Sequence, residues 1–118
     1  MKILFFSMHS SIWQHAFPEA LVAKALMDGG HEVFHIHCDG IFGEICIPMV
    51  ANSLDIDSAI EKKQRVCLMC KENKRLLDDA FGFQSFDLEK YLTAMDIKFV
   101  ENEISRLESK DFFCFQHN

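Results

Sequence analysis

Residues 1–37 read MKILFFSMHSSIWQHAFPEALVAKALMDGGHEVFHIH, and this stretch decides the fold. Residues 3–6 form a continuous apolar run, which is typical of a strand buried in a parallel sheet. A polar loop over residues 7–15 leads to the helix formers around Pro18 and Glu19, and Gly29-Gly30 ends that helix. Residues 31–37 then alternate polar with apolar side chains, as a second strand does. The stretch therefore predicts a β-α-β unit with a right-handed crossover.

The remaining residues extend this start into a single α/β domain over residues 1–118, Rossmann-like at its N-terminus with a parallel sheet and helix-rich in its C-terminal half. The apolar residues of segment 41–53 follow neither a helical nor a strand periodicity, so this segment is expected to form an irregular loop. Ser58 with Glu61 resembles a capping box, which predicts a helix over residues 58–80. Two further helices are expected over residues 87–95 and 97–109. An exposed apolar face on these late helices would indicate that a missing domain or the partner of a homodimer covers it.

Composition and charge exclude several classes of protein. The chain has 118 residues, 49% hydrophobic and 25% charged, which is long enough to bury a core without disulfides. Its net charge of −6 gives no general reason to bind nucleic acid. The basic residues at 62–65 and 71–75 alternate with acids, so we interpret them as a solvated helix face. Without a signal peptide or a long apolar run, the sequence predicts a cytoplasmic protein with no transmembrane segment.

Five cysteines are more than a core of this size usually holds, and the odd number argues against a closed set of disulfides. Cys38, Cys46, Cys67 and Cys70 form an array whose second pair has the Cys-x2-Cys spacing of zinc ligands. Four thiolates can hold a zinc ion or an iron–sulfur cluster. Two alternatives stay open: a redox pair or disulfide, and small buried side chains in a core. Cys114, between phenylalanines, is expected to be a core residue.

The loop after the first strand carries the second set of candidate site residues. Ligands of open parallel sheets bind beyond the carboxyl ends of the strands, where this loop is expected to lie. Ser7, Ser10 and Ser11 offer hydroxyls to a phosphate or a sugar, and Trp13 offers a ring on which a sugar can stack. His9 and His15 are candidates for a general base near neutral pH. A flavodoxin-like loop for FMN phosphate is a further alternative, whereas no glycine-rich dinucleotide motif or P-loop lysine is present.

These motifs together resemble a known family. The opening Met-Lys-Ile-Leu-Phe-Phe, the Ser-x-x-Trp-x-His segment, the Phe-Pro-Glu-Ala-Leu-Val-Ala-Lys-Ala-Leu helix and Gly29-Gly30-His31-Glu32-Val33 are similar to the N-terminal domain of GT-B glycosyltransferases. The bacterial surface and capsular polysaccharide group resembles the chain most, because its second strand also runs into a turn like Cys38-Asp39-Gly40. A further cysteine and a Cys-x2-Cys pair follow there, as Cys46 and Cys67–Cys70 do here. The resemblance spans about residues 1–80.

The resemblance implies the acceptor-side half of a glycosyltransferase. GT-B enzymes bind the nucleotide sugar mainly through a second Rossmann-like domain, and the reaction takes place between the two domains. The chain would then be inactive alone, would meet its nucleotide-sugar donor through the missing domain, and would face the sugar acceptor with the loop over residues 7–15. His15 or His9 would be the base that activates the acceptor. The alternative is a non-catalytic α/β module whose cysteines bind metal, zinc above all, or form a redox centre.

Overall fold

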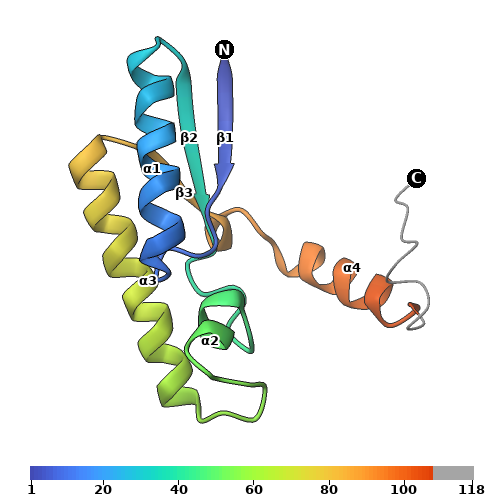
Figure 1. Ribbon diagram of the computed structural model, residues 1–118. Coiled ribbons are helices and arrows are strands. Elements are labelled where there is room, and N and C mark those ends of the chain that lie inside the picture. Colours follow the sequence, from blue (N-terminus) through green and yellow to red (C-terminus); the bar gives the residue numbers. More distant parts are fainter. Residues whose placement is uncertain (108–118) are drawn as a thin grey trace.

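The fold is a three-stranded parallel sheet with helices packed on one of its faces. The computed structural model describes residues 1–107. In chain order the elements are β1 (Lys2–Phe6), α1 (Trp13–Asp28), β2 (Glu32–His37), α2 (Ile47–Ala51), α3 (Ile60–Phe81), β3 (Gln84–Asp87), the short 3-10 helix η1 (Leu88–Lys90) and α4 (Ala94–Ile104). The predicted α/β class, the parallel sheet and the helix-rich second half are confirmed (Figure 1).

The sheet has the strand order β1-β2-β3, with β2 in the centre. Phe5 pairs with His35, and Ile36 pairs with both Phe6 and Phe86, which fixes the register on each side of β2. The two crossovers run through α1 and through α2 with α3, and both long helices lie on the same face of the sheet (Figure 1). The carboxyl ends of all three strands therefore meet at one edge.

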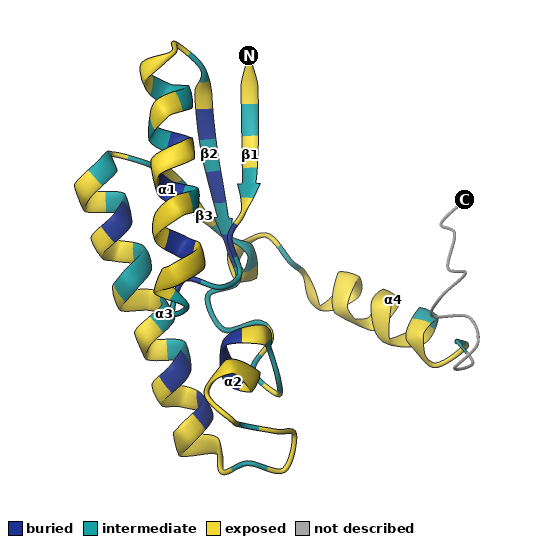
Figure 2. Cartoon of the chain, in the orientation of Figure 1, coloured by how far each residue is buried: buried dark blue, intermediate teal, exposed yellow. Residues whose placement is uncertain are grey.

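Small side chains let α1 approach the sheet and α3 closely. Ala16 and Ala20 pack with Leu77 of α3, and Phe81 and Phe83 close this core from the side. A second packed region lies further along α3, where Pro48 and Met49 of α2 are fully buried and Val66 is 4% exposed. The buried residues thus form two groups along α3, one where α3 packs beside α1 and the sheet and one where it packs against α2 (Figure 2).

The opposite face of the sheet carries apolar side chains that none of the helices within residues 1–107 covers. Leu4 is 61% exposed and Phe6 is 58% exposed, and Phe86 of β3 lies on the same face, with Ile36 of β2 between it and Phe6. Parallel sheets are normally covered on both faces, so this surface is unusual for an isolated unit. Helix α4 extends away from the sheet, and its apolar residues Phe99 and Val100 are also exposed (Figures 1 and 2).

Several expected boundaries were wrong. The loop after β1 ends at Ile12, because α1 begins at Trp13 and contains Pro18 in its interior. The segment expected to be irregular contains α2. Helix α3 has no side-chain cap, since the Ser58 hydroxyl donates to Asp55 Oδ1 at 2.7 Å instead of capping the helix.

The helix expected over residues 87–95 was wrong, whereas the one expected over residues 97–109 is confirmed for residues 97–104, which lie in α4. Residues 84–87 form β3, and one helix, α4, begins after Thr93, which forms a capping box with Asp96. Helix α4 ends at Ile104, short of the expected end at residue 109, and the expected core position of Cys114 lies outside the described residues. Within residues 1–107, no helix is both long enough and apolar enough to span a membrane.

Candidate functional site

A cleft lies at the carboxyl edge of the sheet, where the segments after β1 and β2 meet α3. The space at its mouth, open solvent included, is about 470 Å³, and its lining is mostly apolar. The wall from the β1 loop includes Ser7 and Ser10, and the wall from the β2 end runs from His37 to Gly40 and includes Phe42. Helix α3 supplies the remaining wall. This is the edge at which open α/β sheets bind their ligands.

All four cysteines of the predicted array line this cleft. Cys38 and Cys46 come from the segment after β2, and Cys67 and Cys70 come from consecutive turns of α3. Each is a free thiol and partly buried. Burial raises the pKa of the Cys46 and Cys67 thiols, and the neighbouring cysteines raise these pKa values further. A thiol with a raised pKa is a weak nucleophile at neutral pH, which applies to these two side chains.

The cysteine sulfurs share a cleft but do not form a preassembled metal site. Among residues 1–107, no group of three or more His, Cys, Asp or Glu side chains lies close enough to hold an ion. The set of four thiols has the right chemistry for zinc, which takes four cysteine sulfurs at about 2.3 Å. Binding would therefore require the sulfurs to converge and to lose their protons.

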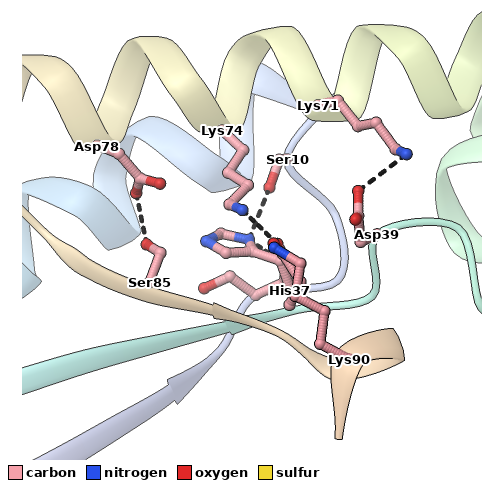
Figure 3. Close-up of polar contacts among 10 residues, drawn as sticks. Ser10, His37, Asp39, Lys71, Lys74, Asp78, Ser85 and Lys90 are labelled. Carbon is pink, nitrogen blue, oxygen red and sulfur yellow. Dashed lines mark hydrogen bonds and ion pairs between the residues drawn. The ribbon is translucent and has the colours of Figure 1, made fainter. Parts of the chain in front are cut away.

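Two lysines of α3 stand at the rim of the cleft, each paired with a carboxylate from a strand end. Lys71 Nζ lies 2.9 Å from Asp39 Oδ1, in the turn after β2 (Figure 3). Lys74 donates to Asp87 at the end of β3, and Lys90 Nζ contacts the other oxygen of Asp87 at 2.6 Å. These pairs connect α3 to the ends of β2 and β3. They also neutralise the two cations, so the cleft is not a strongly positive phosphate site.

The three predicted serines are all at the loop, but their hydroxyls already have different roles. Ser7 is 6% exposed and donates its hydroxyl to Glu19, and its backbone N–H donates to Ile36 O at 2.8 Å. Ser10 is 5% exposed, and its hydroxyl lies 3.5 Å from His37 Nδ1. Its carbonyl accepts from Asn73 Nδ2 at 3.0 Å, which ties the loop to α3. Ser11 Oγ is buried and finds no hydrogen-bond partner in the described part of the chain. Ser7 and Ser10 line the cleft, whereas Ser11 does not.

The predicted base candidates lie near one another beside the cleft. His9 Nε2 is 3.7 Å from Glu19 Oε2, and the rings of His9 and His15 meet edge to face with centroids 6.0 Å apart. His9 lines a smaller cavity between the sheet and the helices, while His15 is exposed on the first turn of α1. Trp13 stacks on Phe17 with centroids 5.4 Å apart and lines neither cavity. The aromatic side chain in the cleft is Phe42, which the sequence did not single out.

The sequence also did not single out the buried face of β2. His35 and His37 point toward the helices and are 3% and 6% exposed. Burial, followed by the positive charge of Lys74, lowers the pKa of His37 to about 4. Burial, followed by the electrostatic influence of the neighbouring His37, lowers the pKa of His35. Both imidazoles are therefore neutral at pH 7. Their position at alternate residues of an apolar strand is the signal that would have found them.

Comparison of the chain with models of protein families, with curated proteins and with solved structures finds no match. The assignment of function therefore depends on the motifs of the sequence and on the geometry of the cleft.

Proposed function

We propose that this chain is the acceptor-side domain of a cytoplasmic glycosyltransferase of surface polysaccharide biosynthesis, and that it is inactive without a nucleotide-sugar-binding domain. One observation carries the proposal: two of the segments that resemble the GT-B family border the same cleft. Ser10 begins the Ser-x-x-Trp-x-His segment, and Cys38-Asp39-Gly40 is the turn after the second strand. They lie far apart in the sequence and meet at the edge of the sheet where ligands of such folds bind.

The chemistry of the cleft supports a sugar acceptor rather than a nucleotide. Its walls are mostly apolar, and Phe42 offers an exposed ring at its margin. The polar groups nearby are hydroxyls, a neutral imidazole and the Lys71–Asp39 pair. Few, well-placed polar groups on an apolar surface are what a small-molecule site requires. A phosphate would find both rim lysines already paired with carboxylates.

The uncovered apolar surfaces support the second part of the proposal. Leu4 and Phe6 on the open face of the sheet, and Phe99 on α4, expose large apolar areas. Such surfaces mark contact with another folded unit. In the proposed enzyme, that unit is the nucleotide-sugar-binding domain, which would bring the donor to the cleft; a second copy of the chain is the other candidate.

In this reaction the acceptor hydroxyl oxygen attacks the anomeric carbon of the donor sugar. The bond from that carbon to the nucleotide phosphate breaks, and the nucleotide leaves with the electron pair. A base takes the proton of the hydroxyl. His9 is the better placed of the two candidates, since it lies beside the cleft and Glu19 can orient its ring and stabilise the imidazolium. His15, whose ring meets the His9 ring edge to face, is the second candidate for the base.

Binding and turnover of the purified chain test the proposal together. We expect a panel of methyl glycosides to bind weakly, UDP-glucose and GDP-mannose not to bind, and no sugar nucleotide to be hydrolysed. Phe42→Ala should weaken glycoside binding. Phe99→Ala removes a ring of comparable exposure on α4 and serves as the matched control. Tight binding of a sugar nucleotide, or equal effects of the two variants, would contradict the proposal.

We propose as a second candidate function that the four cysteines bind zinc and so fix the segment between β2 and α3. The observation in its favour is that Cys38, Cys46, Cys67 and Cys70 line one cleft although they come from distant parts of the sequence. The described residues hold no preassembled group of ligands, so metal binding would draw residues 38–46 toward α3. This role is compatible with the first proposal, because the same segment forms a wall of the cleft.

Elemental analysis of protein prepared under reducing conditions tests the zinc site. We expect about one zinc per chain and its loss in Cys67→Ser, because each thiolate supplies one of four ligands. Cys114→Ser is the matched control and should keep the metal. Less than about a tenth of an equivalent of zinc in the wild-type chain would exclude a structural site with four ligands.

A further inference from the structure

The enclosed part of the cleft is much smaller than its mouth. The cavity volume inside is about 30 Å³, which holds about two water molecules. A sugar ring is larger than two waters, so a wall of the cleft has to move before an acceptor enters. The wall from the β1 loop is tied to α3, since Asn73 donates to the Ser10 carbonyl. The wall that follows β2 is left as the movable one.

The segment after β2 is held less firmly than the elements on either side of it. Every residue from 38 to 46 is half-buried or exposed, whereas His37 before it is 6% exposed and Met49 after it is 0% exposed. Within the described chain, no backbone hydrogen bond joins residues 42–45 to another segment. A segment with few buried side chains and unpaired backbone groups separates from its surroundings at low cost in free energy.

The turn at the β2 end of this segment has the geometry of a hinge. Asp39 and Gly40 both lie in the left-handed region, at φ 47° and φ 107°. The Ile41 N–H donates to the Cys38 carbonyl at 3.1 Å across the turn. No atom lies within 4 Å of a Cβ added at Gly40, so neither a side chain nor a neighbour restricts rotation there.

One ion pair fastens this turn to α3. Lys71 Nζ lies 2.9 Å from Asp39 Oδ1, and the two side chains are 50% and 21% exposed (Figure 3). Ion pairs in contact with water stabilise a structure only weakly, so this contact holds the turn reversibly. Phe42 belongs to the same segment and lies at the margin of the cleft, 44% exposed. Separation of the pair would free the turn and the aromatic ring together.

We propose that residues 38–46 form a lid, closed in this structure, that opens about the Asp39-Gly40 turn when the Lys71–Asp39 pair separates. The inference rests on the proposed function for the ligand that enters, the sugar acceptor, and it adds how access to that site is controlled. Lids of this kind set the rates at which ligands enter and leave a site. The motion itself is a property of the free chain.

The cysteines behind the lid report its opening. Cys67 of α3 lines the cleft and is partly buried, so a bulky reagent such as fluorescein maleimide is expected to reach it through the open state. The labelling rate of Cys67, measured by mass spectrometry with a chelator present, then follows the population of that state. The double variant Asp39→Asn/Lys71→Met should raise the rate about two- to fivefold, the factor that corresponds to one exposed ion pair.

The design of this variant excludes simpler explanations. It removes one negative and one positive charge, so the net charge near the thiol is unchanged, and asparagine tolerates the left-handed turn. The matched control, Lys24→Met/Asp28→Asn, removes an ion pair on α1 and should leave the rate as in the wild type. An unchanged rate in the lid variant, or an equal rise in the control, would overturn the inference.

Hydrogen exchange of the wild-type chain gives a second readout that needs no variant to fold. The Ile41 N–H, at the hinge, should exchange faster than the Val50 N–H, which donates to the Cys46 carbonyl at the start of α2. The reason is that the lid opens while α2 stays packed. Equally slow exchange of the two amides would refute the lid.

Neither experiment contains a sugar, so the lid and the proposed function can fail separately. If the lid variant speeds labelling but no methyl glycoside binds to it or to the wild type, the lid stands and the proposed function loses its support. If glycosides bind while the labelling rate is the same in the lid variant and the wild type, the proposed function survives and the lid is refuted.

Discussion

Replacing Asp87 by asparagine should destabilise the fold measurably, because this carboxylate holds the end of β3 to α3. Its side chain is 12% exposed and receives hydrogen bonds from Lys74, which is 19% exposed, and from Lys90, which is 69% exposed. Burial raises the pKa of Asp87, but the hydrogen bonds and charges of the two lysines outweigh burial and hold that pKa below its ordinary value. The folded state therefore favours the charged form.

The expected loss of stability follows from the two ion pairs that Asp87 forms, with Lys74 and with Lys90. A hydrogen bond to a charged, partly buried group contributes about 1.5–3 kcal/mol, and an exposed ion pair contributes about 0.2–1 kcal/mol. Asp87→Asn should thus cost about 2–3 kcal/mol, which lowers the urea midpoint by roughly 1–2 M for a chain of this size. Lys90→Met removes only the exposed pair and should cost much less than Asp87→Asn.

The difference in stability between wild type and Asp87→Asn should become smaller at acidic pH. Because the pKa of Asp87 is lower in the folded than in the unfolded chain, its contribution is complete above the unfolded pKa of about 3.9. It is lost as the pH falls through the folded pKa. Urea unfolding from pH 7 to pH 3 should show a constant gap between wild type and Asp87→Asn down to about pH 5, then a shrinking gap. A gap that stays constant to pH 3, or an equal cost for Lys90→Met, would refute the reasoning.

Two further predictions concern packing and the end of α3. Met49→Ala should cost about 2–5 kcal/mol in urea unfolding, since Met49 is 0% exposed, whereas Met95→Ala, at 82% exposure, should change stability by less than about 0.5 kcal/mol. Similar effects of the two would mean that the α2 end of α3 has no packed core. Gly82→Ala should cost about 1–2 kcal/mol, because Gly82 ends α3 at φ 73° and no atom lies near an added Cβ, so the penalty is conformational. An unchanged melting temperature would contradict the left-handed end of the helix.

The N-terminal half of the fold could be predicted from local patterns, because each signal there is strong. The apolar run of β1 and the Gly29-Gly30 end of α1 stand out in the sequence, and the pairing of β1 with β2 then follows from the short crossover. The alternation in β2 gave the strand but not its buried side. The side with His35 and His37 is the core side, because Glu19, Ser7 and the two helices cover it.

The C-terminal half of the fold was harder to predict, because its sequence patterns are weaker. Strand β3 has four residues, and its sequence Gln-Ser-Phe-Asp is polar, so only pairing with β2 reveals it. The capping box that exists uses Thr93 with Asp96, whereas the better match to the common pattern, Ser58 with Glu61, caps nothing. The meeting of the cysteines and of Phe42 in one cleft required the tertiary fold, since α3 must return along the sheet to bring Cys67 and Cys70 to the segment after β2.

The most direct test of the central claim, that the cleft at the carboxyl edge of the sheet binds a sugar acceptor, is a map of backbone amide shifts during titration of the nitrogen-15-labelled chain with methyl glycosides. We expect the largest changes in residues 7–12 after β1 and residues 37–43 after β2, with smaller changes near Cys70 and Lys74. Changes confined to the open sheet face around Leu4 and Phe86, or to α4, would contradict the claim.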